Sequence, residues 1–419
     1  MILSALLLVG GFVAGAAPAS ATATSATPAK TKVGTPAKAK TAEASLTPVL
    51  GPDGDAFYTP PSPLPAGKPG DVIWYRPVTT SALLGIVSAS LSSAYKVLYL
   101  SEDTHGNPIA VSGIILVPLL SNPATAPIVG FAPGTQGLGD GCAPSKTIQS
   151  GTEYDQLYIN GLINRGFAVA VTDYEGLGTP GNHTYIIGRS EGHAVNDVVR
   201  AAIRLPATKL SATAKVAFTG YSQGGGGAAW AAELQPTYAP ELNLVGVAAG
   251  GIPADLLAVS QQLDGGLGFG FLIASAVGLD TAYPELNLAS YLNPTGAAAI
   301  KTLETECVGD MLLKYAGHHL SEYVTTNPLN EPAWIARINE QKLGLEPPKV
   351  PMLQWHSSSD EIVAFAQADA LHKTYCAAGV KLSWNVYVGE HVTGLPLGTP
   401  TAEQWIADRF AGKAATSNC

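Results

Sequence analysis

The pentapeptide Gly-Tyr-Ser-Gln-Gly at positions 220–224 is the feature that most constrains this chain. Residues 214–219 before it have the pattern of a short strand, and residues 225–234 after it have the pattern of an Ala-rich helix. A serine on a sharp strand-to-helix turn is held in a strained conformation, and glycines on both sides let neighbouring chain pass close by. A chain with 46 glycines could form this pentapeptide in an ordinary turn. The flanking strand and helix favour a nucleophile at Ser222.

A nucleophilic serine needs a histidine base and an acid that orients it, and in this strand-turn-helix setting the acid precedes the histidine in the chain. A buried-strand pattern over 350–356 runs into a polar turn that contains Asp360, and a second strand pattern over 382–388 ends near His391. Open α/β sheets carry their sites at the carboxyl ends of strands. We therefore predict Asp360 as the acid and His391 as the base. Glu361 is the alternative acid, which we interpret as a solvated turn residue.

The oxyanion of an acyl-transfer reaction needs two hydrogen-bond donors. One donor is expected to be the backbone N–H of Gln223, the residue after the nucleophile. A predicted strand over 127–131 is followed by a Gly-rich loop over 132–137, and Thr135 or Gln136 in this loop would supply the second donor. A tight turn that merely connects two elements is the alternative interpretation of the loop.

The composition requires a large apolar surface to be buried or covered, because 46% of the residues are hydrophobic and only 13% are charged. The run 262–273 shows this most clearly. It is either a buried helix or a surface for an apolar substrate, and in the second case Phe269, Phe271 and Leu272 are the candidate substrate-binding residues. The net charge of -9 gives no basic footprint for nucleic acid and does not favour an anionic membrane.

The N-terminal segment has the pattern of a secretion signal. An apolar stretch that is too short to span a bilayer precedes an A-x-A-type cleavage site, so residues 1–21 are predicted to be a signal peptide and the protein to be secreted. No Lys or Arg precedes the stretch, which suggests that the given start lies inside the true n-region. Residues 22–48 are rich in Ala, Thr, Pro and Lys without apolar periodicity, and we expect a disordered linker there.

The 4 cysteines of a secreted chain predict disulfides, and 4 cysteines allow three pairings. A metal site is the rival interpretation. It lacks the Cys-x-x-Cys or His-x-His spacing that metal sites use, and no Gly-rich loop has a phosphate-binding pattern. No metal or organic cofactor is expected.

Several segments together resemble the secretory lipase family, whose best known members are secreted fungal triacylglycerol lipases. The resemblance runs from about Asp55 to the C-terminus, and its motifs are uncommon outside the family. They are Asp55-Ala56-Phe57-Tyr58-Thr59-Pro60-Pro61, Cys142-Ala143-Pro144-Ser145, Asp173-Tyr174-Glu175-Gly176-Leu177-Gly178, the Ser222 pentapeptide with Gly225, Tyr238 to Gly246, Asp360-Glu361-Ile362-Val363 and Glu390-His391.

The resemblance implies an α/β-hydrolase fold, in which a mostly parallel sheet flanked by helices carries a largely helical cap. We expect the core over 49–250 and 349–419 and the cap over 251–348. The resemblance also makes Ser222, Asp360 and His391 the triad, and pairs Cys142 with Cys307 and Cys376 with Cys419.

Two departures from the fungal members affect what carries over. Fungal members have an acidic residue where Gln136 aligns, which affects a side-chain contribution to the oxyanion hole but not that of the backbone N–H. The chain also ends at Cys419, without the longer tail of some fungal members.

The function predicted from these features is hydrolysis of acylglycerol esters by a secreted serine enzyme through an acyl-enzyme. The alternatives are acyl transfer to an alcohol or glycolipid and peptide hydrolysis on the same triad. A non-enzymatic binding protein is disfavoured, because a matched acid and base are present. The expected partner is a lipid ester, with transient contact with a lipid interface. Acyl-chain length and oligomeric state are not indicated by the sequence.

Overall fold

One sheet runs through the residues that the computed structural model describes, 45–81 and 91–419. Within these ranges its ten strands lie in the order β1-β2-β3-β4-β6-β5-β7-β8-β9-β10. The strands are β1 (Val49–Leu50), β2 (Val72–Val78), β3 (Ser92–Glu102), β4 (Pro108–Pro118), β5 (Ile128–Ala132), β6 (Ala168–Thr172), β7 (Lys215–Tyr221), β8 (Asn243–Gly250), β9 (Met352–Ser357) and β10 (Leu382–Tyr387). The predicted signal peptide and most of the predicted linker lie outside the described residues.

The strands from β6 to β10 across the sheet pair in parallel, whereas β2, β3, β4 and β6 pair antiparallel with one another in that order. Strands β5 and β6 are buried at every position, and β7 is buried at all but its first. Parallel strands covered on both faces have such continuous small or apolar runs, since neither side of the strand meets water. This part of the sheet brings the carboxyl ends of β7, β8 and β9 to one edge.

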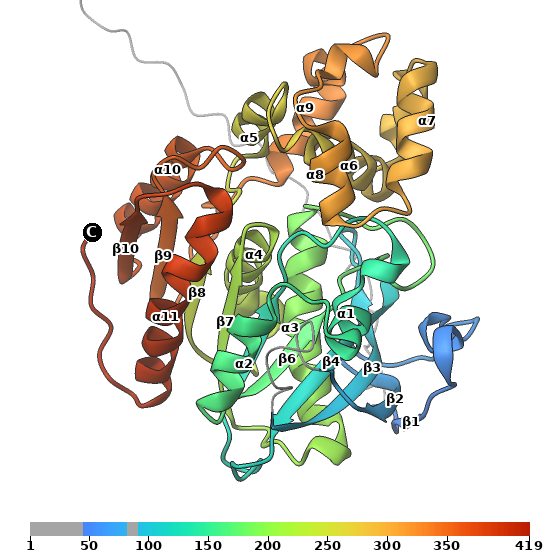
Figure 1. Cartoon of the computed structure of the whole chain (residues 1–419). Coiled ribbons are helices and arrows are strands. Elements are labelled where there is room, and N and C mark those ends of the chain that lie inside the picture. Colours follow the sequence, from blue (N-terminus) through green and yellow to red (C-terminus); the bar gives the residue numbers. More distant parts are fainter. Residues whose placement is uncertain (1–44, 82–90) are drawn as a thin grey trace, which may run out of the picture. The chain divides into compact units, whose positions relative to one another are not determined.

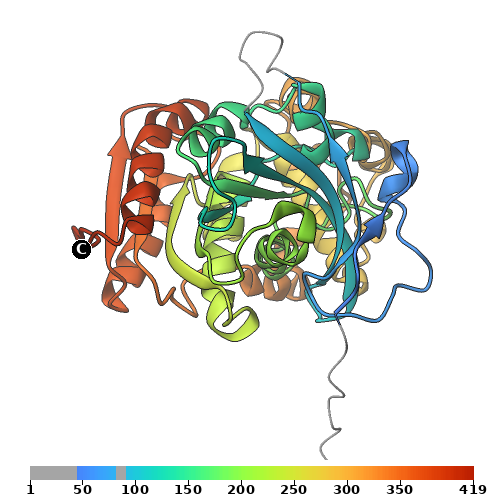
Figure 2. The same ribbon diagram turned by 90° about the horizontal axis from the view of Figure 1, so that it is seen from below.

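Helices cover both faces of the sheet (Figures 1 and 2). Buried residues of α3 (Gly188–Arg204), α4 (Gln223–Tyr238) and α10 (Phe365–Ala377) share one apolar core with the sheet. Residues of α1 (Pro144–Ser150), α2 (Gln156–Asn164) and α11 (His391–Phe410) share a second core with the other face. This layered arrangement is an α/β-hydrolase fold.

Five α-helices lie between β8 and β9 in the chain and group together at the top of Figure 1. They are α5 (Leu256–Leu263), α6 (Phe269–Ala282), α7 (Pro294–Leu303), α8 (Val308–Tyr315) and α9 (Pro332–Glu340). Their buried side chains form an apolar core separate from the two cores on the sheet. We call this group the cap helices. None of the helices in the described part of the chain is long and apolar enough to cross a membrane.

The apolar run 262–273 is not one continuous helix. Helix α5 ends at Leu263, and α6 begins at Phe269. Gly265 between them has a φ of 78°, which a side chain rarely adopts, and its N–H donates to the carbonyl of His318, 2.9 Å away. The break turns α6 so that most of its residues are buried in the cap.

Two disulfides tie distant parts of the fold together. Cys142, after β5, is linked to Cys307 at the start of α8, so the bond joins the core to the cap helices. Cys376 in α10 is linked to Cys419 and holds the C-terminus. This is the pairing that the family resemblance implies.

Candidate active site

Ser222 occupies the turn between β7 and α4, with a φ of 60° and a ψ of -125°. Such a conformation in a residue other than glycine costs on the order of 1–3 kcal/mol and is found mainly at functional sites. Its N–H donates to the carbonyl of Gly250, 3.0 Å away on β8. A Cβ added at Gly220 or Gly224 would collide with the carbonyl oxygen of Ala132, so both positions require glycine. The pentapeptide therefore encodes both the strain and the close packing around it.

The structure brings Ser222, His391 and Asp360 together. The Nε2 atom of His391 lies 2.8 Å from Ser222 Oγ, and its Nδ1 atom lies 2.7 Å from Asp360 Oδ2. A carboxylate can only accept, so Nδ1 carries the proton and Nε2 is left to accept the serine O–H. The serine is supplied by the β7–α4 turn, the carboxylate by the loop after β9, and the imidazole by the first residue of α11.

Asp360 is surrounded by donors. Its Oδ1 accepts the N–H groups of Ile362 and Val363, at 3.0 and 2.7 Å, and its Oδ2 also lies 3.2 Å from His356 Nε2. Burial alone would raise the pKa of Asp360, but the hydrogen bonds from His356 and His391 hold the pKa well below its usual range. Asp360 is therefore a carboxylate at neutral pH.

Two residues that contact the backbone of His391 were not anticipated. Glu361 was interpreted from the sequence as a solvated turn residue, but it is only partly exposed and its Oε2 accepts the His391 N–H at 2.9 Å. The Tyr221 hydroxyl donates to the His391 carbonyl at 2.7 Å. Both contacts fix the start of α11 and leave the imidazole free to reach Asp360 and Ser222. The sequence places both residues near the site, since Tyr221 lies inside the pentapeptide and Glu361 follows Asp360, but no local pattern indicates these contacts.

The predicted oxyanion loop lies close to Ser222. Thr135 lines a cavity together with Ser222 and His391, and its hydroxyl is 2.8 Å from the hydroxyl of Tyr185. The side-chain amide of Gln136 instead donates to Glu153 Oε1 at 3.0 Å and to the Gly134 carbonyl at 3.3 Å. The amide of Gln136 is thus used to hold the loop.

A pair of buried carboxyl groups, Glu153 and Asp155, is hydrogen-bonded to this loop. Asp155 Oδ2 accepts the Gly134 N–H at 3.0 Å, and Glu153 accepts from Gln136 and from the Thr147 hydroxyl. Burial raises the pKa of both groups, and the nearby charge of Glu153 raises that of Asp155 further. No local sequence pattern indicates this support.

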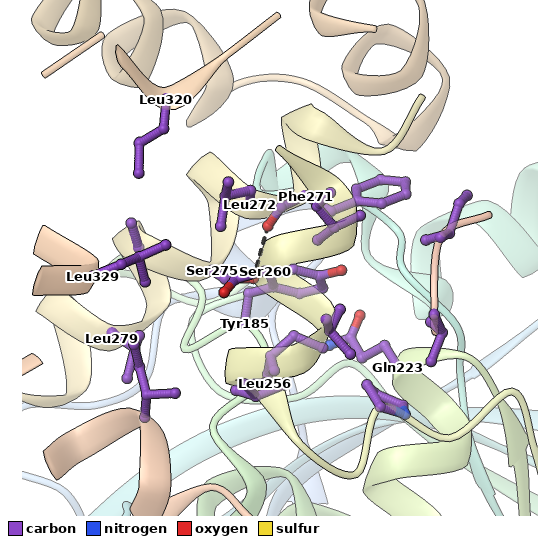
Figure 3. A pocket seen from close by; sticks show the side chains of 18 of the residues that line it. Tyr185, Gln223, Leu256, Ser260, Phe271, Leu272, Ser275, Leu279, Leu320 and Leu329 are labelled. Carbon is purple, nitrogen blue, oxygen red and sulfur yellow. Dashed lines mark hydrogen bonds between the residues drawn. The ribbon is translucent and has the colours of Figure 1, made fainter. Parts of the chain in front are cut away.

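Two cavities meet at Ser222. The first, which we call the cap cavity, extends among the cap helices and is also lined by Gln223; Figure 3 shows leucines of α5 and α6 around it. The second, the His391 cavity, lies on the imidazole side and is lined by apolar residues of α8 and α11. Phe271 and Ile362 line both.

The candidate substrate-binding residues are divided by the structure. Phe271 and Leu272 line the cap cavity. Phe269 lies elsewhere: it is fully buried, and its ring packs on Tyr323 with centroids 5.2 Å apart. Phe269 therefore supports the cap core. In the described ranges, no group of three or more His, Cys, Asp or Glu residues is placed to hold a metal ion.

Comparison with known proteins identifies the family of this chain. The secretory lipase family matches residues 142–418. Lipase 10 of Candida albicans is 31% identical over 402 residues, which cover 90% of this chain and 85% of that protein. Secreted triacylglycerol lipase LIP1 of Malassezia furfur is 28% identical over 385 residues, covering 87% of this chain and 77% of that protein. The crystal structure of Candida antarctica lipase A in its closed state superposes with a TM-score of 0.77 at 28% identity, covering 86% of this chain and 87% of that one. The chain thus belongs to the secretory lipase family and is a carboxylic ester hydrolase.

Proposed function

We propose that this protein is a secreted lipase that hydrolyses acylglycerol esters through a triad of Ser222, His391 and Asp360. The observation that carries the proposal is the unbroken hydrogen-bonded line from Ser222 Oγ through His391 to Asp360, with Ser222 at the meeting point of two apolar cavities. The apolar cap cavity suits an acyl chain, and a relative in Malassezia furfur carries the name of a secreted triacylglycerol lipase.

Acylation begins when Ser222 Oγ attacks the ester carbonyl and His391 Nε2 takes its proton. Asp360 accepts from His391 Nδ1, keeps the ring in the required tautomer and stabilises the imidazolium. The negative oxygen of the tetrahedral intermediate is bound by the N–H of Gln223, at the free N-terminal end of α4, and by an N–H of the loop at Thr135 and Gln136. Collapse of the intermediate transfers the proton from His391 to the departing alcohol and leaves an acyl-Ser222 ester.

Water completes the cycle. His391 takes a proton from the water as the oxygen attacks the acyl-Ser222 carbonyl, and the second intermediate uses the same donors. Its collapse returns the proton to Ser222 Oγ and releases the fatty acid. Every step uses side chains and backbone groups of this chain together with water.

The two cavities suggest which part of the substrate lies where. The departing alcohol oxygen must receive its proton from His391 Nε2, so the alcohol part belongs in the His391 cavity. The acyl chain then lies in the cap cavity, which is lined by Gln223 but not by His391. Each methylene buried there contributes about 0.8 kcal/mol, or about fourfold in kcat/KM, until the cavity is full.

Ester series test the assignment. One series varies the acyl chain from acetate to palmitate on a constant alcohol, and a second varies the alcohol on a constant acetyl group. Leu279→Ser, in the cap cavity, is expected to flatten only the first series, and Leu395→Ser, in the His391 cavity, only the second. If both variants lowered all esters equally, or the wild type preferred acetate in the first series, the lipase assignment would fail.

Acyl transfer is the second candidate, and the His391 cavity favours it. A separate apolar cavity on the imidazole side could hold an acceptor alcohol in place of water. The acyl-enzyme would then pass its acyl group to the alcohol oxygen, with His391 taking the alcohol proton. The ratio of ester to free acid formed in the presence of octanol measures this directly. An excess of ester at low octanol concentration would make acyl transfer the main activity.

A further inference from the structure

The residue that follows the nucleophile is held by two buried side chains. Gln223 Nε2 lies 2.8 Å from Glu191 Oε1 and 3.1 Å from His183 Nε2. All three side chains are buried. Neither Glu191 nor His183 is a sequence neighbour of the β7–α4 turn: Glu191 belongs to the first turn of α3, and His183 belongs to the segment before α3.

The hydrogen bonds fix the orientation of each group. The Glu175 carbonyl, 2.8 Å from His183 Nδ1, can only accept, so Nδ1 carries the proton and His183 Nε2 accepts. Burial lowers the pKa of His183 to about 4, which keeps the ring neutral at neutral pH. Gln223 therefore uses both hydrogens of its amide, one toward His183 and one toward Glu191. A flipped amide would turn its oxygen toward two acceptors.

Glu191 also contacts Ile186, whose backbone is strained. Its Oε1 accepts the N–H of Ile186 at 2.9 Å. Ile186 has a φ of 67°, which is an outlier for a β-branched side chain, and it lines the cap cavity. Oε1 of Glu191 thus contacts both Ile186 and Gln223, the residue after the strained Ser222. Figure 3 shows Tyr185, which precedes Ile186, and Gln223, which follows Ser222, beside the cap cavity.

The same segment reaches the other half of the predicted oxyanion hole. The Tyr185 hydroxyl contacts the Thr135 hydroxyl, and Tyr174, which stacks on His183, donates its hydroxyl to the Pro133 carbonyl at 3.0 Å. The segment 183–191 therefore contacts both parts of the predicted oxyanion hole, Gln223 and the loop at Thr135. A displacement of about 1 Å at such a site can cost on the order of a hundredfold in rate.

We propose that Glu191 is a positioning residue for ester hydrolysis: together with His183 it holds the side chain of Gln223, and thereby fixes the Gln223 N–H that binds the oxyanion. Glu191 acts through Gln223 and touches no reacting atom. The inference rests on the proposed function, since it concerns the oxyanion formed on Ser222.

Helix α4 offers a matched control at its other end. Glu233 is 5% exposed and Glu191 is 2% exposed, and burial raises the pKa of each to about 7. Glu233 likewise accepts backbone N–H groups, from Gly344 and Glu346, and one side-chain donor, the Tyr375 hydroxyl. The partners of Glu233 lie away from Ser222. Glu191→Leu and Glu233→Leu therefore each remove a buried carboxyl group that accepts backbone and side-chain hydrogen bonds, and they differ in whether Gln223 is released.

The test is steady-state hydrolysis of p-nitrophenyl butyrate, with active sites counted by a phosphonate inhibitor and stability followed by urea unfolding. We expect Glu191→Leu and Gln223→Met each to lower kcat by about 10- to 100-fold, with KM changed by less than about threefold. The double variant should be no slower than the slower single variant. Glu191→Gln keeps an acceptor oxygen and should recover part of kcat. Glu233→Leu should lose similar stability but keep its kcat.

Several results would overturn the inference. A folded Glu191→Leu with wild-type kcat would do so, as would multiplicative losses in the double variant, because Glu191 would then not act through Gln223. If Glu191→Leu does not fold, Gln223→Met decides: an unchanged kcat removes the role. Ser222→Ala is measured in parallel. Its retention of turnover would overturn the proposed function itself, whereas an inactive Ser222→Ala with a fully active Glu191→Leu would overturn only the role of Glu191.

Discussion

Two aspartates, Asp360 and Asp197, both have buried side chains, yet their pKa values are shifted in opposite directions. Both side chains are 0% exposed. Hydrogen bonds from His356 and His391 hold the pKa of Asp360 well below its usual range, although burial opposes them. Burial instead raises the pKa of Asp197 to about 6, although the charge of Arg200 and three hydrogen bonds oppose it. Burial alone therefore does not decide how a carboxyl group in this protein titrates.

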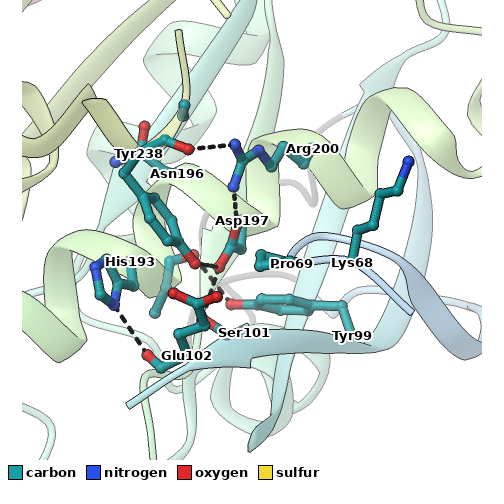
Figure 4. A network of polar contacts seen from close by, with 12 residues as sticks. Lys68, Pro69, Tyr99, Ser101, Glu102, His193, Asn196, Asp197, Arg200 and Tyr238 are labelled. Atoms are coloured by element: carbon teal, nitrogen blue, oxygen red, sulfur yellow. Dashed lines mark hydrogen bonds and ion pairs between the residues drawn. The ribbon is translucent and has the colours of Figure 1, made fainter. Parts of the chain in front are cut away.

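The donors explain the difference. Asp360 receives two backbone N–H groups on one oxygen and two imidazoles on the other. Asp197 receives the Ser101 and Tyr238 hydroxyls, each at 2.7 Å, and the guanidinium of Arg200 at 2.8 Å (Figure 4). Arg200 is shared with Glu241 and with the Tyr238 carbonyl. The Asp197 cluster links β3, α3 and the end of α4, whereas the Asp360 cluster leads to a serine at two cavities.

We expect the Asp360 cluster to control turnover and the Asp197 cluster to control stability. Ser222→Ala should lower ester turnover by about 10⁵-fold or more, because only oxyanion binding and substrate positioning remain. Urea unfolding should show a folded protein, since removal of one hydroxyl leaves the packing around position 222 in place. Hydrolysis of p-nitrophenyl butyrate measures the effect, and turnover near that of the wild type would place the nucleophile elsewhere.

Asp360→Asn should lower kcat by about 10⁴-fold, because an amide no longer holds His391 in the tautomer that can accept the serine proton. Glu361→Gln should cost far less, since Glu361 contacts only the backbone of His391. Asp197→Asn is the matched control outside the site and should leave kcat unchanged. A larger loss in Glu361→Gln than in Asp360→Asn would exchange the two roles.

Asp197→Leu should lower the free energy of unfolding by about 3–5 kcal/mol, because it leaves Arg200 without one partner and two hydroxyls without an acceptor. The folded fraction of this variant should turn over short esters at the wild-type rate. Urea unfolding and active-site titration separate the two quantities. A loss of kcat per active site would connect the Asp197 cluster to catalysis.

The features that could be predicted from the sequence are those that leave a pattern among neighbouring residues. The glycines around Ser222, the strand ends before Asp360 and His391, and the alternation of strands and helices in the core each leave a mark within a few residues. The supporting contacts leave none, because Glu191, His183 and Asp155 reach the site from segments whose spacing to it is set only by the fold. Phe269 and Phe271 show the same limit. They are two positions apart, yet one packs in the cap and the other lines both cavities.

The free energy of unfolding should change with pH in opposite directions for the two aspartates. This is the smallest of the four expected effects. An unfolded Asp has a pKa near 3.9. Between about pH 4 and 6 the native protein keeps a proton on Asp197 that the unfolded chain has lost, so wild-type stability should fall relative to Asp197→Asn as pH rises, by on the order of 2–3 kcal/mol.

Asp360 has the opposite sign. Its native pKa is lowered, so the stability that it contributes is present above about pH 4 and is lost as pH falls below that value. Urea unfolding of the wild type, Asp197→Asn and Asp360→Asn from about pH 3 to 8 gives both difference curves. Difference curves that change in the same direction with pH would show that the donors around Asp360 and Asp197 do not set how each titrates.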